Sequence, residues 1–236
     1  MERYGDYNEV DEAPGQSPVL KIIKILAAVI CFSVIGFIGF RIFTFNYYPD
    51  STKNLSFTNA LTEHYNARGG DITVYTQKLA AAYDDNKEGN FFCDHLRFVP
   101  EAGTLQVTLR YNTSLYEDIE KKYGVKLSDD SRDSFHFRLT RSGGDKETGR
   151  LVIAEWDEFL MYRYVKLVFE DVELDEVLAA TSEDWIRLDV QIDGVQDKDE
   201  KTGVKTDHIF RILVLDNVEK YTAIKEYEPT DGEVPV

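Results

Sequence analysis

The sequence predicts a mainly β protein: an antiparallel β-sandwich of immunoglobulin-like architecture with one or two short helices, preceded by a single transmembrane helix. Three observations lead to this prediction. One long apolar run lies near the N-terminus, short segments of alternating apolar and polar residues fill most of the remainder, and turn-forming residues separate those segments. Hydrophobic residues make up 43% and aromatic residues 13% of the 236 residues, which is enough for a sizeable core.

The apolar run has the length of a membrane span. Residues 25–40 carry no charge, and Lys24 and Arg41 flank them where their side chains can reach the lipid head groups. With the apolar residues on either side the span covers 22–43, which is about 33 Å of helix against a hydrocarbon core of about 30 Å. A cleaved signal peptide is the alternative, but bulky residues follow the run where small ones are needed for cleavage. We therefore expect a transmembrane helix at residues 21–45.

Positive charges near the span predict its orientation. The nearest ones are Arg3, Lys21 and Lys24 before the span and Arg41 and Lys53 at or after it. Because Lys and Arg are enriched on the cytoplasmic side, this bias favours an acidic cytoplasmic tail at residues 1–20 and a C-terminal domain outside the plasma membrane. Ser33, Gly36 and Gly39 share roughly one helix face, but they lack the spacing of a packed helix dimer. Helix pairing through Gly36 and Gly39 is therefore an alternative that we do not favour.

The remainder of the chain divides into three parts. Residues 46–70 are expected to form a stalk or short helical lead-in, in which Thr58 caps a helix that ends before Gly69. Residues 71–228 are expected to form the β-rich domain outside the cytoplasm. Residues 229–236 form an acidic tail.

The clearest unit in the domain is a β-hairpin. The strands are expected at 91–99 and 105–111, and the turn between them contains Pro100 and Gly103. In the second strand, apolar side chains alternate with Gln106, Thr108 and Arg110, which predicts one buried and one solvent-facing side. A short helix is expected next, because Ser114 and Glu117 have the spacing of a capping box. Its apolar face is Leu115, Ile119 and Tyr123, and Gly124 ends it.

Alternation predicts further strands towards the C-terminus. They are expected around residues 72–76, 135–139, 162–169, 186–192, 209–215 and 221–227. The segment 209–215 is apolar on both faces, so we expect it to be a central strand. The sequence does not predict the order of the strands.

Charge excludes one class of partner. The net charge is −16, of which the first 20 residues contribute −4, residues 21–44 contribute +3 and the remainder −15. Such an acidic surface repels phosphate backbones, so we expect no nucleic-acid partner. The expected partners are the lipid bilayer, through the transmembrane helix, and a protein of the cell envelope.

A resemblance emerges from three runs of sequence: FVPEAGTLQVTLRYNTS, YRYVKLVFEDVEL and DWIRLDV. They resemble uncharacterised single-pass membrane proteins of anaerobic Gram-positive bacteria over most of residues 70–220. The resemblance implies an anchored domain and carries no known activity, so it assigns a role to no residue.

No motif predicts a catalytic centre or a cofactor site, and no metal site is expected. The acidic loop 193–208 is the nearest candidate, because Asp197, Asp199 and Asp207 could offer oxygen ligands to calcium. Three lysines in the same loop oppose that hypothesis, and Lys201 stands at a position where a calcium-binding loop needs an oxygen. We therefore expect a solvated hairpin tip here, with calcium as the alternative.

Three functional hypotheses remain. The first is a non-catalytic, membrane-anchored interaction module that acts outside the cytoplasm through strand faces or loops. The second is a cell-envelope hydrolase, which would need two carboxylates converging in a cleft. The third is an accessory subunit of a membrane complex, with the transmembrane helix as its contact.

Overall fold

The computed structural model describes residues 18–77, 91–127, 131–143, 146–174, 177, 184–216, 221–225 and 227–229. The chain divides into two compact units, residues 1–47 and 48–236, which are described separately. Most of the expected cytoplasmic tail, residues 1–17, lies outside the described residues. So do residues 230–236 of the expected acidic tail.

The described part of the first unit, from residue 18 onwards, contains one helix, α1 (Pro18–Asn46). Its 29 residues correspond to a length of about 44 Å. Residues 18–44 are long and apolar enough to cross a membrane, which confirms that one apolar N-terminal helix precedes the β-rich part. Gly36 and Gly39 lie on its surface, and a Cβ atom added at either would meet no atom within 4 Å.

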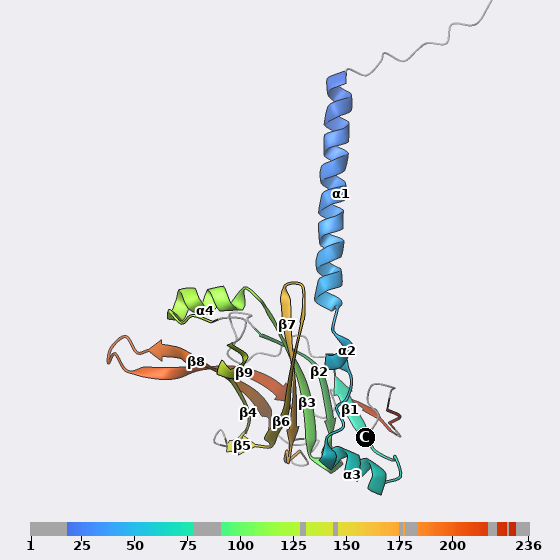
Figure 1. Ribbon diagram of the computed structural model, residues 1–236, viewed down its shortest axis with the longest axis vertical. Coiled ribbons are helices and arrows are strands. Elements are labelled where there is room, and N and C mark those ends of the chain that lie inside the picture. The colour runs from blue at the N-terminus through green and yellow to red at the C-terminus, as the bar shows by residue number, and fades with distance from the viewer. Residues whose placement is uncertain are drawn as a thin grey trace, which may run out of the picture. The chain divides into compact units, whose positions relative to one another are not determined.

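The second unit is an antiparallel β-sandwich, as the sequence predicts (Figure 1). In hydrogen-bonding order, the strands of the six-stranded sheet are β10 (Thr222–Ile224), β1 (Val74–Gln77), β2 (Phe91–Val99), β3 (Thr104–Asn112), β7 (Tyr162–Glu170) and β6 (Arg150–Phe159). Those of the four-stranded sheet are β5 (Lys146–Thr148), β4 (Phe135–Arg141), β8 (Ile186–Lys198) and β9 (Lys205–Leu215).

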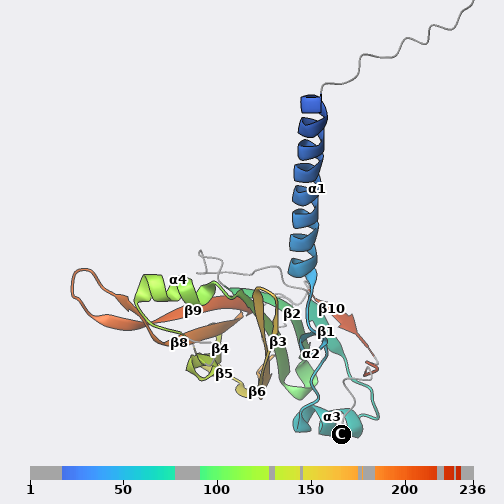
Figure 2. The same ribbon diagram turned by 45° about the horizontal axis from the view of Figure 1, so that its top comes forward.

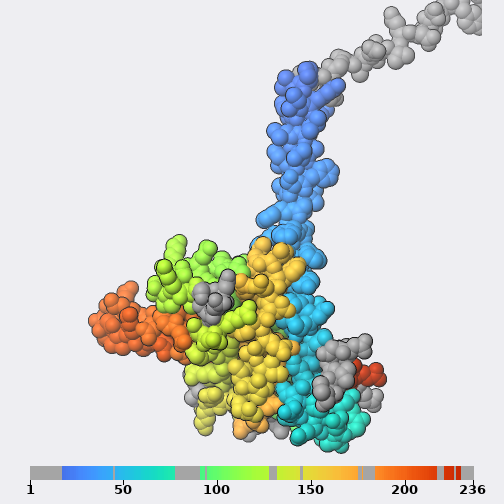
Figure 3. Space-filling model, viewed as in Figure 1, coloured from blue at the N-terminus to red at the C-terminus, as the bar shows by residue number. Residues whose placement is uncertain are grey.

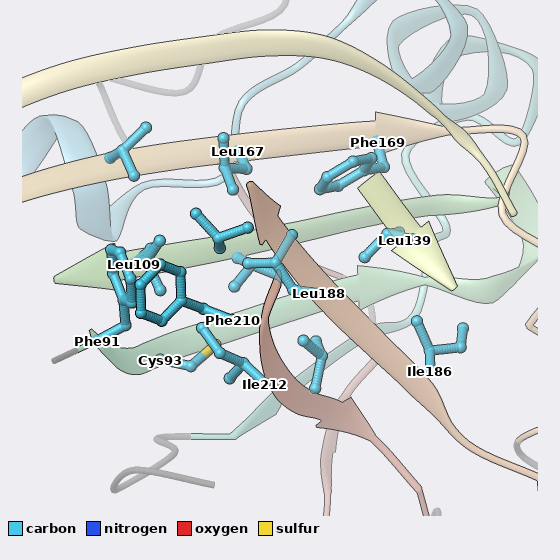
Figure 4. Close-up of a cluster of buried hydrophobic side chains, with 14 of the residues drawn as sticks. Phe91, Cys93, Leu109, Leu139, Leu167, Phe169, Ile186, Leu188, Phe210 and Ile212 are labelled. Carbon is cyan, nitrogen blue, oxygen red and sulfur yellow. The ribbon is translucent and has the colours of Figure 1, made fainter. Parts of the chain in front are cut away.

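The hydrophobic core fills the space between the two sheets (Figure 4). Phe91, Leu109 and Leu167 come from the six-stranded sheet and meet Leu188 and Phe210 of the other. All are fully or almost fully buried. This is the outcome that period-two alternation predicts for two sheets that each turn one apolar face inward.

Both faces of β3 are buried, which corrects the prediction of a solvent-facing side. Gln106 and Thr108 are 0% exposed and Arg110 is 1% exposed. The first part of the second unit, residues 48–67, forms a covering segment on this side, so Gln106 and Thr108 bind protein groups instead of water.

The covering segment contains two short helices, α2 (Asp50–Lys53) and α3 (Asn59–Ala67). The hydroxyl of Thr58 accepts a hydrogen bond from the backbone N–H of Leu61 at 3.3 Å, which confirms the predicted cap. Leu61 then packs in a second apolar cluster with Leu55, Ile72 and Val99. Residues 48–67 are therefore folded onto the sandwich.

Two details differ from the predictions. The helix α4 (Leu115–Tyr123) ends at Gly124 as expected, where a left-handed φ of 72° suits glycine. Ser114, however, has helical backbone angles and its side chain makes no capping hydrogen bond. In addition, β9 stands at an edge of its sheet and not at the centre. Phe210 and Ile212 on one face of β9 lie in the core between the sheets, whereas Ile209 and Leu213 on the other face are only partly buried.

Candidate functional site

The strands β8 and β9 extend beyond the sandwich as a two-stranded arm, which we define as residues 193–208. β4 pairs with β8 only as far as Ile192, whereas β8 and β9 continue to pair up to Lys198 and Lys205. Figures 1 and 2 show the arm projecting from the domain, and in the space-filling view of Figure 3 its orange surface extends beyond the green surface next to it. Among the described residues, the arm is the most prominent projection of the domain.

The arm contains the three carboxylates that the sequence offers to calcium, but it does not bring them together. Gln196 pairs with Asp207, and Asp197 pairs with Thr206. Directly opposed residues share a face and successive residues alternate, so Asp197 and Asp207 lie on opposite faces of the ribbon. A single ion cannot reach both, and in the described ranges no three side chains of His, Cys, Asp or Glu are grouped to hold a metal.

Each carboxylate instead binds a group of the arm. Asp197 Oδ2 lies 2.7 Å from Nδ1 of His208. The two oxygens of Asp207 accept hydrogen bonds from the side-chain amides of Gln191 and Gln196 at 3.1 and 3.0 Å. The contacts of Gln196 and His208 tie β8 to β9 beyond Ile192, where the ribbon has no third strand among the described residues.

Asp199 organises the turn at the tip of the arm. Its Oδ1 accepts from the backbone N–H groups of Lys201 and Thr202 at 2.8 and 2.7 Å. Those hydrogen bonds, chiefly the one from Thr202, lower the pKa of Asp199 below its ordinary value. A general acid needs a raised pKa, so the pKa of Asp199 is shifted in the opposite direction.

The base of the arm is packed against α4. Val195 is fully buried, and a Cβ atom on the adjacent Gly194 would come 3.4 Å from Val125, just after α4. The rings of Tyr123 and His208 lie 5.3 Å apart. The base is therefore fixed, while the outer residues 196–207 are exposed.

A polar hollow of about 530 Å³ lies elsewhere, beside the β4–β5 turn. Its lining includes Arg141, Glu147 and Glu173. Arg141 holds two carboxylates, with its guanidinium 3.0 Å from Glu173 and 3.2 Å from Asp184. Both acids thus serve as partners of one cation.

The outer face of the six-stranded sheet holds the covering segment by a set of buried polar contacts. The Gln106 side chain accepts from Ser56 N–H and donates to the Asn54 carbonyl, both at 2.8 Å. Thr108 donates to the Thr52 carbonyl at 2.8 Å. From the sequence, these side chains are predicted only to face solvent. An alternating pattern does not distinguish a polar side chain that binds water from one that binds backbone groups.

An aromatic cluster also lies on the outer face of the six-stranded sheet. The guanidinium of Arg110 lies 5.1, 5.2 and 5.0 Å from the ring centres of Tyr48, Phe92 and Tyr162. The Tyr48 ring also meets Tyr164 edge-on at 5.5 Å. Cation–π and aromatic contacts therefore fix the first residue of the folded unit.

Comparison with known proteins identifies no relative: no family, no curated protein and no solved structure matches this chain.

Proposed function

We propose that the chain is a membrane-anchored interaction module. In this proposal α1 crosses the plasma membrane with its N-terminus in the cytoplasm, and the β-sandwich stands outside. The domain binds a protein of the cell envelope through the β8–β9 arm. The length and composition of α1 and the distribution of Lys and Arg around it support the anchoring and the orientation.

The observation that most supports the proposed binding is that the arm projects from the domain. A two-stranded ribbon is marginally stable by itself. This ribbon is stabilised by the contacts of Asp197 and Asp207 and by the buried Val195, yet its outer part contributes nothing to the core. It presents a strand edge and a loop to solvent, which are the elements that proteins use for strand addition and loop recognition.

The hydrolase hypothesis stays a prediction. Its carboxylate pair would be sought at the polar hollow, whose lining residue Glu173 is bound to Arg141. The same arginine also binds Asp184, which does not line the hollow. The accessory-subunit hypothesis also stays a prediction, with the surface of α1 as its contact.

Photo-crosslinking in living cells tests the proposed binding. A photoreactive residue is placed at Val204, which is 56% exposed on the arm, and in a control chain at Ile224, which is 41% exposed on β10. We expect a discrete adduct of one size from position 204 and none of that size from position 224. Failure to obtain an arm-specific adduct would contradict binding through the arm.

A further inference from the structure

The turn between β6 and β7 combines an exposed apolar side chain with an unfavourable backbone conformation. Phe159 pairs with Tyr162, so Leu160 and Met161 form the two-residue turn. Leu160 is 57% exposed and has a φ of +53°. Such hairpin turns favour Gly, Asn or Asp at positions of positive φ, and a bulky residue there is uncommon. Local conformation therefore does not explain the leucine, and strain of this kind points to a role in function.

The same turn lies beside the start of the folded unit. Phe159 and Met161 pack against the cluster of Tyr48, Tyr162 and Tyr164. The next residues of the covering segment bind the same hairpin. Ser51 donates to the Asp157 carboxylate at 2.6 Å, and the Ser51 carbonyl accepts from Lys166 at 2.7 Å.

Chain connectivity limits the distance of this cluster from the apolar helix. α1 ends at Asn46, and Tyr48 follows two residues later. Since consecutive Cα atoms are 3.8 Å apart, the Cα atoms of Asn46 and Tyr48 are separated by at most about 7.6 Å. If α1 spans a bilayer, the cluster around Tyr48 cannot lie far from the bilayer surface.

We propose that the β6–β7 turn, with Leu160 at its tip, contacts the head-group region of the bilayer that α1 crosses. This inference depends on the proposed membrane anchoring. Apolar and aromatic side chains enter the boundary between head groups and acyl chains, where Leu160 would bury its exposed surface. Residues 45–236 carry a net charge of −15, which disfavours electrostatic docking on anionic lipid. The turn therefore binds lipid by inserting apolar side chains and not by electrostatic attraction to the phosphate groups.

The full chain in vesicles tests this contact. In a Cys31→Ser parent, an environment-sensitive fluorophore is attached at Leu160→Cys or, as the matched control, at Val204→Cys. The two positions are apolar, 57% and 56% exposed, and both lie in hairpin turns. The buried Cys93 is retained in all chains. Labelling of the Cys31→Ser parent, which has no cysteine at position 160 or 204, measures the background from Cys93.

We expect a blue-shifted emission and strong quenching by lipids that carry a spin label near the head group at position 160, and neither at position 204. The difference should be the same in phosphatidylcholine alone and in mixtures with phosphatidylglycerol. Equal responses of the two positions, in a chain that resists carbonate extraction, would overturn the inference and leave the anchoring intact. Extraction of the chain by carbonate would overturn the anchoring and this inference together.

Discussion

At the scale of single residues, Gln106 shows how a buried polar side chain stabilises the domain. Its amide satisfies one N–H and one carbonyl of the covering segment. Gln106→Leu leaves both backbone groups without these bonds, so we expect the free energy of unfolding to fall by about 2–4 kcal/mol. The control is Gln196→Leu on the arm. It removes a hydrogen bond to Asp207, which is exposed and can bind water instead, so the free energy of unfolding should fall by no more than about 0.5 kcal/mol. Denaturant titration of the chain in micelles measures both, and equal losses would contradict the assigned contacts.

The buried phenol of Tyr111 makes the free energy of unfolding depend on pH in the alkaline range. Burial, with the hydrogen bond to Tyr116 at 3.1 Å, raises the pKa of Tyr111 well above its ordinary value. The unfolded chain releases the phenol proton near pH 10, whereas the folded chain keeps it. Above that pH the unfolded state binds fewer protons, so stability falls by about 1.4 kcal/mol per pH unit for each such tyrosine.

We therefore expect Tyr111→Phe to be less sensitive to alkali than the parent. The measurement is denaturant unfolding at several pH values from 9 to about 11.5, a range chosen around the ordinary tyrosine pKa of about 10. Tyr221, whose pKa burial also raises, stays in both chains and keeps part of the slope. Identical slopes for the two chains would show that Tyr111 is not the buried phenol described.

At the scale of elements, the two expected helix caps differ in the structure. Thr58 accepts a hydrogen bond from Leu61 N–H, while the side chain of Ser114 makes no capping bond. Thr58→Ala should therefore lower the free energy of unfolding by about 1 kcal/mol, and Ser114→Ala by less than about 0.5 kcal/mol. Thermal unfolding of both variants beside the parent checks the order, and a larger loss from Ser114→Ala would refute it.

The sequence predicts some elements well for identifiable reasons. The hairpin of β2 and β3 has strict alternation and a turn with Pro100 and Gly103, so pattern and turn chemistry agree. β6 goes unpredicted because it is an edge strand whose faces are only partly buried, and because the turn after it contains Leu160 where a turn residue is expected. The same absence of a turn signal conceals the proposed lipid contact.

The covering segment shows a second limit of sequence patterns. Alternation on β3 correctly predicts the core-facing side, where Leu105 and Val107 are buried. It cannot predict that residues 51–56 bind the other side, because their contacts are made through backbone carbonyls and N–H groups that every residue possesses. Long-range pairing of this kind depends on the chain path and not on local periodicity.

At the scale of the whole molecule, the anchor and the domain together define the proposed role. A projecting arm can meet an envelope protein only if the domain lies on the outer side of the membrane. The direction in which α1 crosses the bilayer is therefore the central claim.

Protease protection in intact cells, with cell walls removed, measures that direction most directly. The chain carries one tag at its N-terminus and another at its C-terminus, and detergent-opened cells show that both tags can be cleaved. We expect external protease to remove the C-terminal tag and degrade the chain beyond residue 50, while the N-terminal tag survives on a fragment that contains α1. A C-terminal tag that remains protected until the cells are opened would contradict the account.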